Sequence, residues 1–209
     1  MSRVEEGLNT GYKKCPLTQG ANIITGILLA AGYASRFGSQ KLLARLADGR
    51  RLVEASMSPL SAACSGNVIV VTRRDPDLIR LLETCDCRIV INDHAAQGIG
   101  TSIAVAVASA SDASGWVIAL GDMPFVRRET VIEIVAALRG GAYIALPTMD
   151  GKRGHPVGFS ARYRHRLQAL TGDTGAREII NADANFVEAV SVADPGIFLD
   201  IDTRADINR

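Results

Sequence analysis

Short, continuous apolar runs alternate along this chain with stretches in which apolar residues recur at helical spacing. The runs cover residues 23–29, 68–71, 88–91, 116–120 and 143–146. Runs of this length without polar alternation are typical of strands that are buried on both faces. Because such strands alternate with helices in βα units, the pattern predicts an α/β protein whose mostly parallel sheet is covered by helices on both sides.

The stretches between these runs predict three amphipathic helices. Their apolar faces cover residues 52–60, 78–82 and 131–138. The second helix is expected to begin at Asp75-Pro76, because an aspartate side chain can cap free backbone N–H groups and proline fits the first helical turn.

The pattern also predicts how the chain is organised. Residues 22–209 show no repeat, linker or low-complexity tract, so we expect one domain there. Residues 1–21 have no hydrophobic period and are predicted to be a flexible N-terminal extension. Residues 156–160, 186–192 and 197–202 read as further short strands, which predicts a sheet that becomes mixed toward its end.

Composition narrows the function classes. The chain has 209 residues, 47% of them apolar, and a formal net charge of +1. A near-neutral chain has no general attraction for nucleic acid or anionic membranes, so neither is expected as a partner. The four cysteines, Cys15, Cys64, Cys85 and Cys87, form no CxxC pair, which argues against a zinc site or a disulfide framework.

The first apolar run resembles the core of a signal peptide, because Lys13 and Lys14 precede it. Glu5 and Glu6 before the run, and Gly26 within it, argue against that interpretation. No run approaches the ~20 apolar residues of a membrane-spanning helix. We therefore expect a cytoplasmic protein.

A glycine-containing loop over residues 29–41 follows the first predicted strand. Arg36 offers a fork of donors for phosphate oxygens, and Lys41 adds a compact positive charge. The spacing excludes a P-loop, and residues 98–103 fail the dinucleotide fingerprint because they end on Ile. From composition alone, a triphosphate-binding loop and an ordinary turn with solvated basic residues are equally supported.

The same loop resembles the L-A-x-G-x-x-x-R-x-G-x-x-K signature of the molybdopterin nucleotidyltransferase-like family. The matching residues are Leu29, Ala30, Gly32, Arg36, Gly38 and Lys41. The resemblance implies a three-layer, Rossmann-like nucleotidyltransferase fold in which this loop cradles the triphosphate, with Arg36 and Lys41 on its phosphates. The third position is Ala31, as in the cytidylyltransferases that act on the molybdenum cofactor, whereas guanylyltransferases tend to carry glycine. A methyl group beside the base is a physically sensible way to disfavour a purine.

Two carboxylates are candidates for holding a metal ion. Asp122 follows the run at 116–120 in a G-D-x-P tetrapeptide, where the family resemblance implies a metal ligand; a simple turn aspartate is the alternative. Asp200 and Asp202 are two residues apart in the predicted strand 197–202, so both side chains would point to the same side of it. This segment resembles the closing segment of the family. Asp202 is the second candidate, and a helix N-cap is its alternative.

Three further segments resemble parts of the family that face the acceptor or the nucleotide. The G-H-P-V-x-F segment contains Gly154, His155 and Pro156, and a G-D-x-G-x-R segment ends at Arg177. Residues 92–102, with Gly98 and Ser102, resemble a stretch that approaches the nucleotide or the acceptor. The basic segment 162–166 is interpreted as a solvated helix face.

The resemblance, which covers residues 24–205, implies a magnesium-dependent enzyme. It would transfer CMP from CTP to the terminal phosphate of molybdopterin and release pyrophosphate, with Arg36, Lys41 and Asp122 catalytic. Mn²⁺ could replace Mg²⁺, and a molybdenum hydroxylase that receives the product is the implied partner. The alternatives are GTP as donor, another phosphorylated acceptor such as a sugar phosphate, or a non-catalytic carrier of the molybdenum cofactor.

Overall fold

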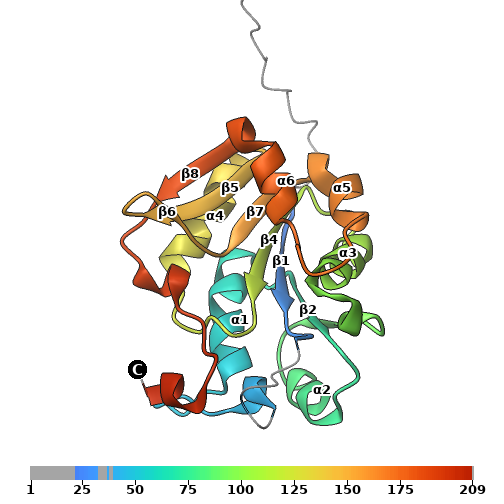
Figure 1. The fold of residues 1–209 in the computed structure, drawn as a ribbon, viewed down its shortest axis with the longest axis vertical. Coiled ribbons are helices and arrows are strands. Elements are labelled where there is room, and N and C mark those ends of the chain that lie inside the picture. Colours follow the sequence, from blue (N-terminus) through green and yellow to red (C-terminus); the bar gives the residue numbers. More distant parts are fainter. Residues whose placement is uncertain (1–21, 33–36, 38–39, 209) are drawn as a thin grey trace, which may run out of the picture.

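The computed structural model describes residues 22–32, 37 and 40–208 (Figure 1). The extension predicted for residues 1–21 lies outside the described residues, as do Arg36 and Gly38 of the first loop. Within the described ranges, no helix is both long enough and apolar enough to cross a membrane.

A central sheet organises this part of the chain. Its strands are β1 (Ile24–Leu29), β2 (Val68–Thr72), β3 (Arg88–Ile91), β4 (Gly115–Leu120), β5 (Ile144–Met149), β6 (Lys152–Arg153), β7 (Val157–Ser160) and β8 (Val187–Ser191). The order is β3-β2-β1-β4-β7-β5-β6, and β8 also pairs with β5. The pairs β1–β2, β1–β4, β2–β3 and β5–β8 are parallel, whereas β7 is antiparallel to β4 and β5. The structure thus confirms the predicted mostly parallel sheet that becomes mixed toward its end.

Helices cover both faces of the sheet (Figure 1). One face packs against α1 (Leu52–Ala63), α2 (Pro76–Leu82) and α4 (Arg128–Arg139), and the other against α3 (Ile99–Ser109), α5 (Arg164–Gln168) and α6 (Arg177–Ala182). Strand β1 shows why: Ile24 and Leu28 join one apolar cluster, and Ile27 and Leu29 join the other. Every residue of β1 is buried, as expected for a continuous apolar run in the middle of such a sheet.

The predicted start of the second helix is confirmed. The Asp75 side chain accepts a hydrogen bond from the Leu78 N–H at 3.0 Å, and Pro76 occupies the first turn of α2. This cap satisfies a backbone donor that has no partner within the helix.

The strand predicted at 197–202 is wrong. Residues Pro195–Phe198 instead form a short 3₁₀ helix, and the chain after it is irregular. The buried Asp194 carboxylate explains the bend, because it accepts hydrogen bonds from the Gly196 N–H at 2.9 Å, the Thr130 hydroxyl at 2.6 Å and the Arg127 N–H at 2.8 Å. These tertiary hydrogen bonds outweigh the alternating pattern of the sequence.

The basic segment 162–166 is only partly solvated, so that prediction needs correction. Arg164 lies over the ring of the buried Trp116 at 4.8 Å and donates to the Ala113 carbonyl at 2.8 Å. Arg166 donates to Asp183 at 2.6 Å. Arg164 attaches α5 to β4 and Arg166 attaches it to the end of α6, because a long side chain can pack its stem and flat head on apolar surface while its donors remain bonded.

Candidate active site

Strands β1 and β4 end side by side at one edge of the sheet. Leu29 lies opposite Leu120, and the Gly121 N–H donates to the Leu29 carbonyl at 2.9 Å. A Cβ at Gly121 would lie 2.9 Å from the same carbonyl oxygen, so a side chain there would push the strand ends apart. The close approach holds the next residue, Asp122, beside the start of the first loop, at the carboxyl end of the strands where ligands bind in open α/β sheets.

The Lys41 ammonium group lies between two carboxylates. Its Nζ is 2.9 Å from Asp122 Oδ2 and 3.4 Å from Asp202 Oδ1. Lys41 begins a short 3₁₀ helix, Lys41–Leu43, and is buried with 9% of its surface exposed. Asp202 reaches the cluster because the Ile201 N–H donates to the Asp122 carbonyl at 2.9 Å. Three residues that lie far apart in the sequence therefore meet at the edge of the sheet.

A cavity of about 200 Å³, which we call the small cavity, adjoins this cluster. It is lined by Leu29, Ala30, Gly32, Gln40, Lys41, Leu42, Asp122 and Asp202. The structure thus brings together most of the residues that the first-loop and carboxylate motifs single out. Ala31 is buried with 5% exposed and is not among the lining residues.

The carboxylates of the small cavity fit a hard divalent cation. Both place an oxygen within 3.4 Å of one point, the Lys41 Nζ. Mg²⁺ takes one or two carboxylates and completes its shell with water and substrate phosphate oxygens. In the part of the chain that the structure describes, no group of three His, Cys, Asp or Glu side chains is placed to hold a metal ion. Two carboxylates alone do not complete the shell of such an ion, so water and substrate oxygens would have to supply the other ligands of any cation held beside Asp122 and Asp202.

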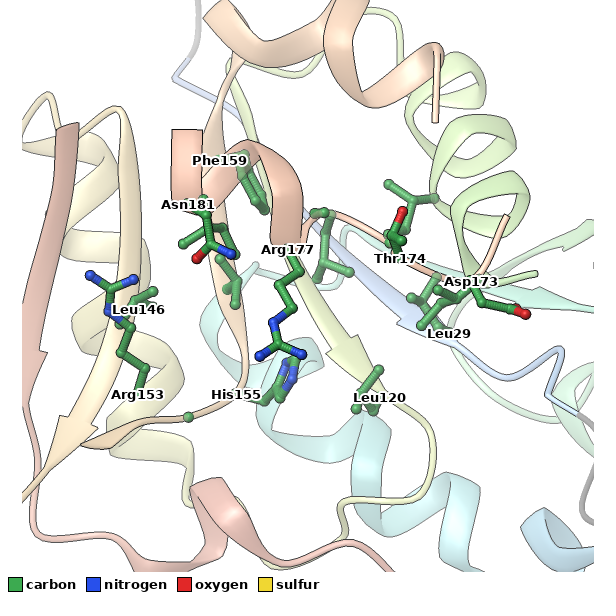
Figure 2. A pocket seen from close by; sticks show the side chains of 18 residues that line it. Leu29, Leu120, Leu146, Arg153, His155, Phe159, Asp173, Thr174, Arg177 and Asn181 are labelled. Atoms are coloured by element: carbon green, nitrogen blue, oxygen red, sulfur yellow. The ribbon is translucent and has the colours of Figure 1, made fainter. Parts of the chain in front are cut away.

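A larger cavity of about 520 Å³, which we call the large cavity, lies on the face of the sheet covered by α3 and α6 (Figure 2). Its apolar lining is Leu29, Ile99, Ile103, Ile118, Leu120, Leu146, Val157, Phe159, Gly175, Ala176 and Ile180. Its polar and backbone lining is Arg153, Gly154, His155, Asp173, Thr174, Arg177 and Asn181. The His155 segment and the Arg177 segment thus face one space, and Leu29 lines both cavities.

His155 lines the large cavity and lies within the electrostatic reach of Asp122 and Asp200. Burial lowers the pKa of His155, while the negative charges of Asp122 and Asp200 act in the opposite direction. The ring is therefore neutral at pH 7 and offers one donor and one acceptor. Its buried Nδ1 has no hydrogen-bond partner among the described residues. Figure 2 shows the Arg177 side chain extending from α6 toward this ring.

Two other predicted residues of the His155 segment pack against the protein. Gly154 lines the large cavity, and a Cβ there would lie 2.6 Å from Ile197 Cγ1, so glycine allows the segment to cross Ile197 closely. Pro156 is buried and does not line the large cavity.

Gly98 and Ser102 lie at the start of α3 and are not among the residues that line either cavity, although their neighbours Ile99 and Ile103 line the large cavity. Gly98 has φ +110°, and a Cβ there would lie 2.2 Å from the carbonyl carbon of Gly172. The Gly100 N–H donates to the Gly172 carbonyl at 2.9 Å. Ser102 is buried and accepts from the Asn92 amide at 2.9 Å. Gly98 and Gly100 thus allow the loop that carries Asp173 to Arg177 to pack closely on the start of α3, because a Cβ at either position would collide with the loop backbone.

Asp173 and Thr174 line the large cavity within the segment that the sequence predicted to face the acceptor, whereas sequence reasoning missed Arg153 and Asn181. Arg153 directly precedes the Gly154-His155 segment, and that proximity was the available signal. Most arginines in the described ranges bond to a carboxylate or carbonyl or lie over a ring. Arg153 and Arg177 have no such partner among these residues, so both guanidinium groups are available to a ligand.

The fold and the site together define a nucleotidyltransferase. Residues 26–187 match the family described as the MobA-like NTP transferase domain. The chain belongs to this family.

Two relatives match nearly the whole chain. The nicotine blue oxidoreductase of Paenarthrobacter nicotinovorans is 29% identical over 194 residues, which is 89% of this chain and 95% of the relative. A probable molybdenum cofactor guanylyltransferase of Bacillus subtilis (strain 168) is 26% identical over 196 residues, which is 87% of this chain and 92% of the relative.

Solved structures show the same fold. Rv0371c of Mycobacterium tuberculosis H37Rv superposes with a TM-score of 0.77 at 27% identity, covering 90% of this chain and 96% of that one. The structure of that protein in complex with manganese has a TM-score of 0.73 and covers 88% and 95% of the two chains.

Proposed function

We propose that this enzyme transfers CMP from CTP to the terminal phosphate of molybdopterin and releases pyrophosphate. The observation that carries the proposal is the meeting of Lys41, Asp122 and Asp202 beside the first loop, next to the large cavity. The small cavity supports a triphosphate site, since it combines loop backbone, a buried ammonium group and two carboxylates. The large cavity supports an acceptor site.

The acceptor phosphate is already anionic, so the proposed in-line attack on the α-phosphorus requires no general base. Catalysis then consists of positioning the reactants and neutralising charge. Lys41 offsets negative charge on the phosphates, and its burial strengthens that effect because little water screens it. Asp122 and Asp202 would hold Mg²⁺ or Mn²⁺, which supplies further positive charge when bound. Arg36 is assigned to the phosphates from the loop motif.

The large cavity suits a flat acceptor with polar edges. Its volume of about 520 Å³ lies within the range of roughly 300–1,000 Å³ for small-molecule sites. Apolar side chains of the sheet form one wall, while Arg153, Arg177 and the neutral His155 offer hydrogen bonds to an oxygen-rich group. A pterin that carries a phosphate has this combination of properties.

CTP is proposed as the donor from Ala31 at the third position of the loop motif. Ala31 is buried and does not line the small cavity, so the choice of CTP rests on the loop motif alone. GTP is the rival donor, favoured by the relative named as a guanylyltransferase.

Pyrophosphate release with Mg²⁺ tests the proposal. CTP, GTP, ATP and UTP are each incubated with molybdenum cofactor and with a sugar phosphate. We expect release with CTP only, and only when molybdenum cofactor is present. Release with GTP would overturn the assignment of the base, and release with the sugar phosphate would overturn the acceptor. CTP binding without consumption would support the carrier alternative.

Substitution of Arg153 tests the acceptor site. We expect Arg153→Met to raise the KM for the acceptor about tenfold, the size of one charge-assisted hydrogen bond, with little change in the KM for the nucleotide. Lys152→Met is the matched control, because this exposed residue lies on the same strand but does not line the large cavity. An unchanged KM for the acceptor in Arg153→Met would remove Arg153 from the site.

A further inference from the structure

An ion pair next to the sheet edge holds both ends of the first loop. Arg73, just after β2, donates from Nη1 to the Gly32 carbonyl at 2.9 Å, and its Nη2 lies 3.4 Å from Asp75 Oδ2. The side-chain amide of Gln40 donates to the same Asp75 oxygen. Gly32 and Gln40 both line the small cavity, whereas Arg73 and Asp75 do not.

The carboxylate that anchors this network also caps a helix. Asp75 caps α2 through the Leu78 N–H at 3.0 Å, and its side chain is 15% exposed. Burial acts to raise the pKa of Asp75, but hydrogen bonds from the Leu78 N–H and the Gln40 amide, together with the charge of Arg73, outweigh it and lower the pKa. The carboxylate is therefore ionised at neutral pH. Strand β2 adds a further tie, because the Ala30 N–H donates to the Val71 carbonyl at 2.8 Å.

We propose that Arg73 is a positioning residue for the nucleotide. Together with Asp75 it fixes the spacing between Gly32 and Gln40, and therefore the place of Lys41, which follows Gln40 directly. This inference rests on the proposed nucleotide site. Arginine suits the task because its planar fork bonds a carbonyl and a carboxylate at the same time, whereas lysine carries its donors on a single nitrogen.

The neighbouring residue provides a matched control. Arg74 pairs with the exposed Asp93 at 2.7 Å, and its guanidinium forms its bonds there, away from Gly32 and Gln40. Arg74→Met thus removes the same charge and an ion pair from the adjacent position. Exposed ion pairs of this kind contribute little to stability, so the control isolates the contribution of the Arg73 contacts.

Equilibrium binding of CTP and of GTP with Mg²⁺, in the absence of any acceptor, tests the proposal. We expect Arg73→Met to weaken binding of the preferred nucleotide about tenfold, since it removes hydrogen bonds that involve a charged group. Arg73→Lys should recover part of the loss, and Arg74→Met should bind like the wild type. In turnover, the KM for the nucleotide should rise in Arg73→Met while the KM for the acceptor stays constant.

Asp75→Asn keeps the proposal testable if Arg73→Met does not fold. Asparagine retains the cap of α2 but removes the charge that holds Arg73, and we expect weaker nucleotide binding from it as well. A lower unfolding midpoint with unchanged nucleotide binding in these variants would overturn the proposal, because the network would then be structural only. An equal loss in Arg74→Met would also overturn it. If the wild type binds neither CTP nor GTP, the proposed function fails first, and this inference fails with it.

Discussion

Asp122→Asn is expected to lower turnover by about three orders of magnitude while the protein remains folded. The side chain is the closer of the two carboxylates to Lys41, at 2.9 Å, and it projects from the edge of the sheet where β1 and β4 end. Asparagine has nearly the same shape but removes the negative charge that a divalent cation requires. Initial rates of pyrophosphate release at saturating nucleotide and Mg²⁺ measure the effect.

The folded state of Asp122→Asn is expected to persist for a structural reason. The backbone carbonyl of Asp122 accepts the Ile201 N–H at 2.9 Å, and this hydrogen bond does not depend on the side chain. Lys41 also keeps Asp202 as a partner. Asp112→Asn, at an exposed turn after α3, is the control for loss of one carboxylate. Full activity in Asp122→Asn would rule out the metal assignment, and circular dichroism establishes that the variant is folded.

Lys41→Met is expected to slow the chemical step by about 100-fold or more. Methionine fills most of the buried space of the lysine stem but carries no charge, so the departing pyrophosphate loses a cation in a poorly solvated position. The loss also leaves Asp122 and Asp202 without the ammonium group between them, and the two carboxylates then repel each other.

Single-turnover measurements separate the chemical step from binding and product release in Lys41→Met. Lys152→Met, an exposed lysine on β6, is the control for loss of one positive charge. An unchanged single-turnover rate together with an unchanged KM for the nucleotide would show that Lys41 acts only as a structural partner of the two carboxylates. A raised KM with an unchanged rate would limit its role to binding of the nucleotide.

The hydrophobic pattern by itself determined the class of fold. Each of the five apolar runs became a strand of the sheet, as expected for runs of this length without polar alternation. The start of α2 could also be predicted from the sequence, because the Asp75 cap forms a hydrogen bond with a residue only three positions away. The first loop and Asp122 could be placed at strand ends for the same reason, since a strand end is visible in the sequence.

Contacts between distant segments could not be predicted in the same way. Asp202 approaches Lys41 through an irregular segment that is attached by the Ile201 N–H to the Asp122 carbonyl, and not by the alternation of a strand. Arg153 faces the large cavity opposite residues of a loop that begins about twenty positions later. The hydrogen bonds that join Arg73 to Gly32, and Gln40 to Asp75, likewise form because β1 and β2 lie side by side.

The sequence alone therefore predicted the class of fold, most of the strands and the helices α1, α2 and α4, together with the residue types that could carry phosphate and metal chemistry. Only the tertiary structure decided that Lys41, Asp122 and Asp202 share one site, and that Gly98 serves loop packing. The physical reason is that the hydrophobic period of a strand or helix, and the capping of a helix, depend on residues that are close together in the sequence. The register of the sheet, and the close approach of loops such as residues 171–173 to Gly98 and Gly100, depend on the packing of the whole core.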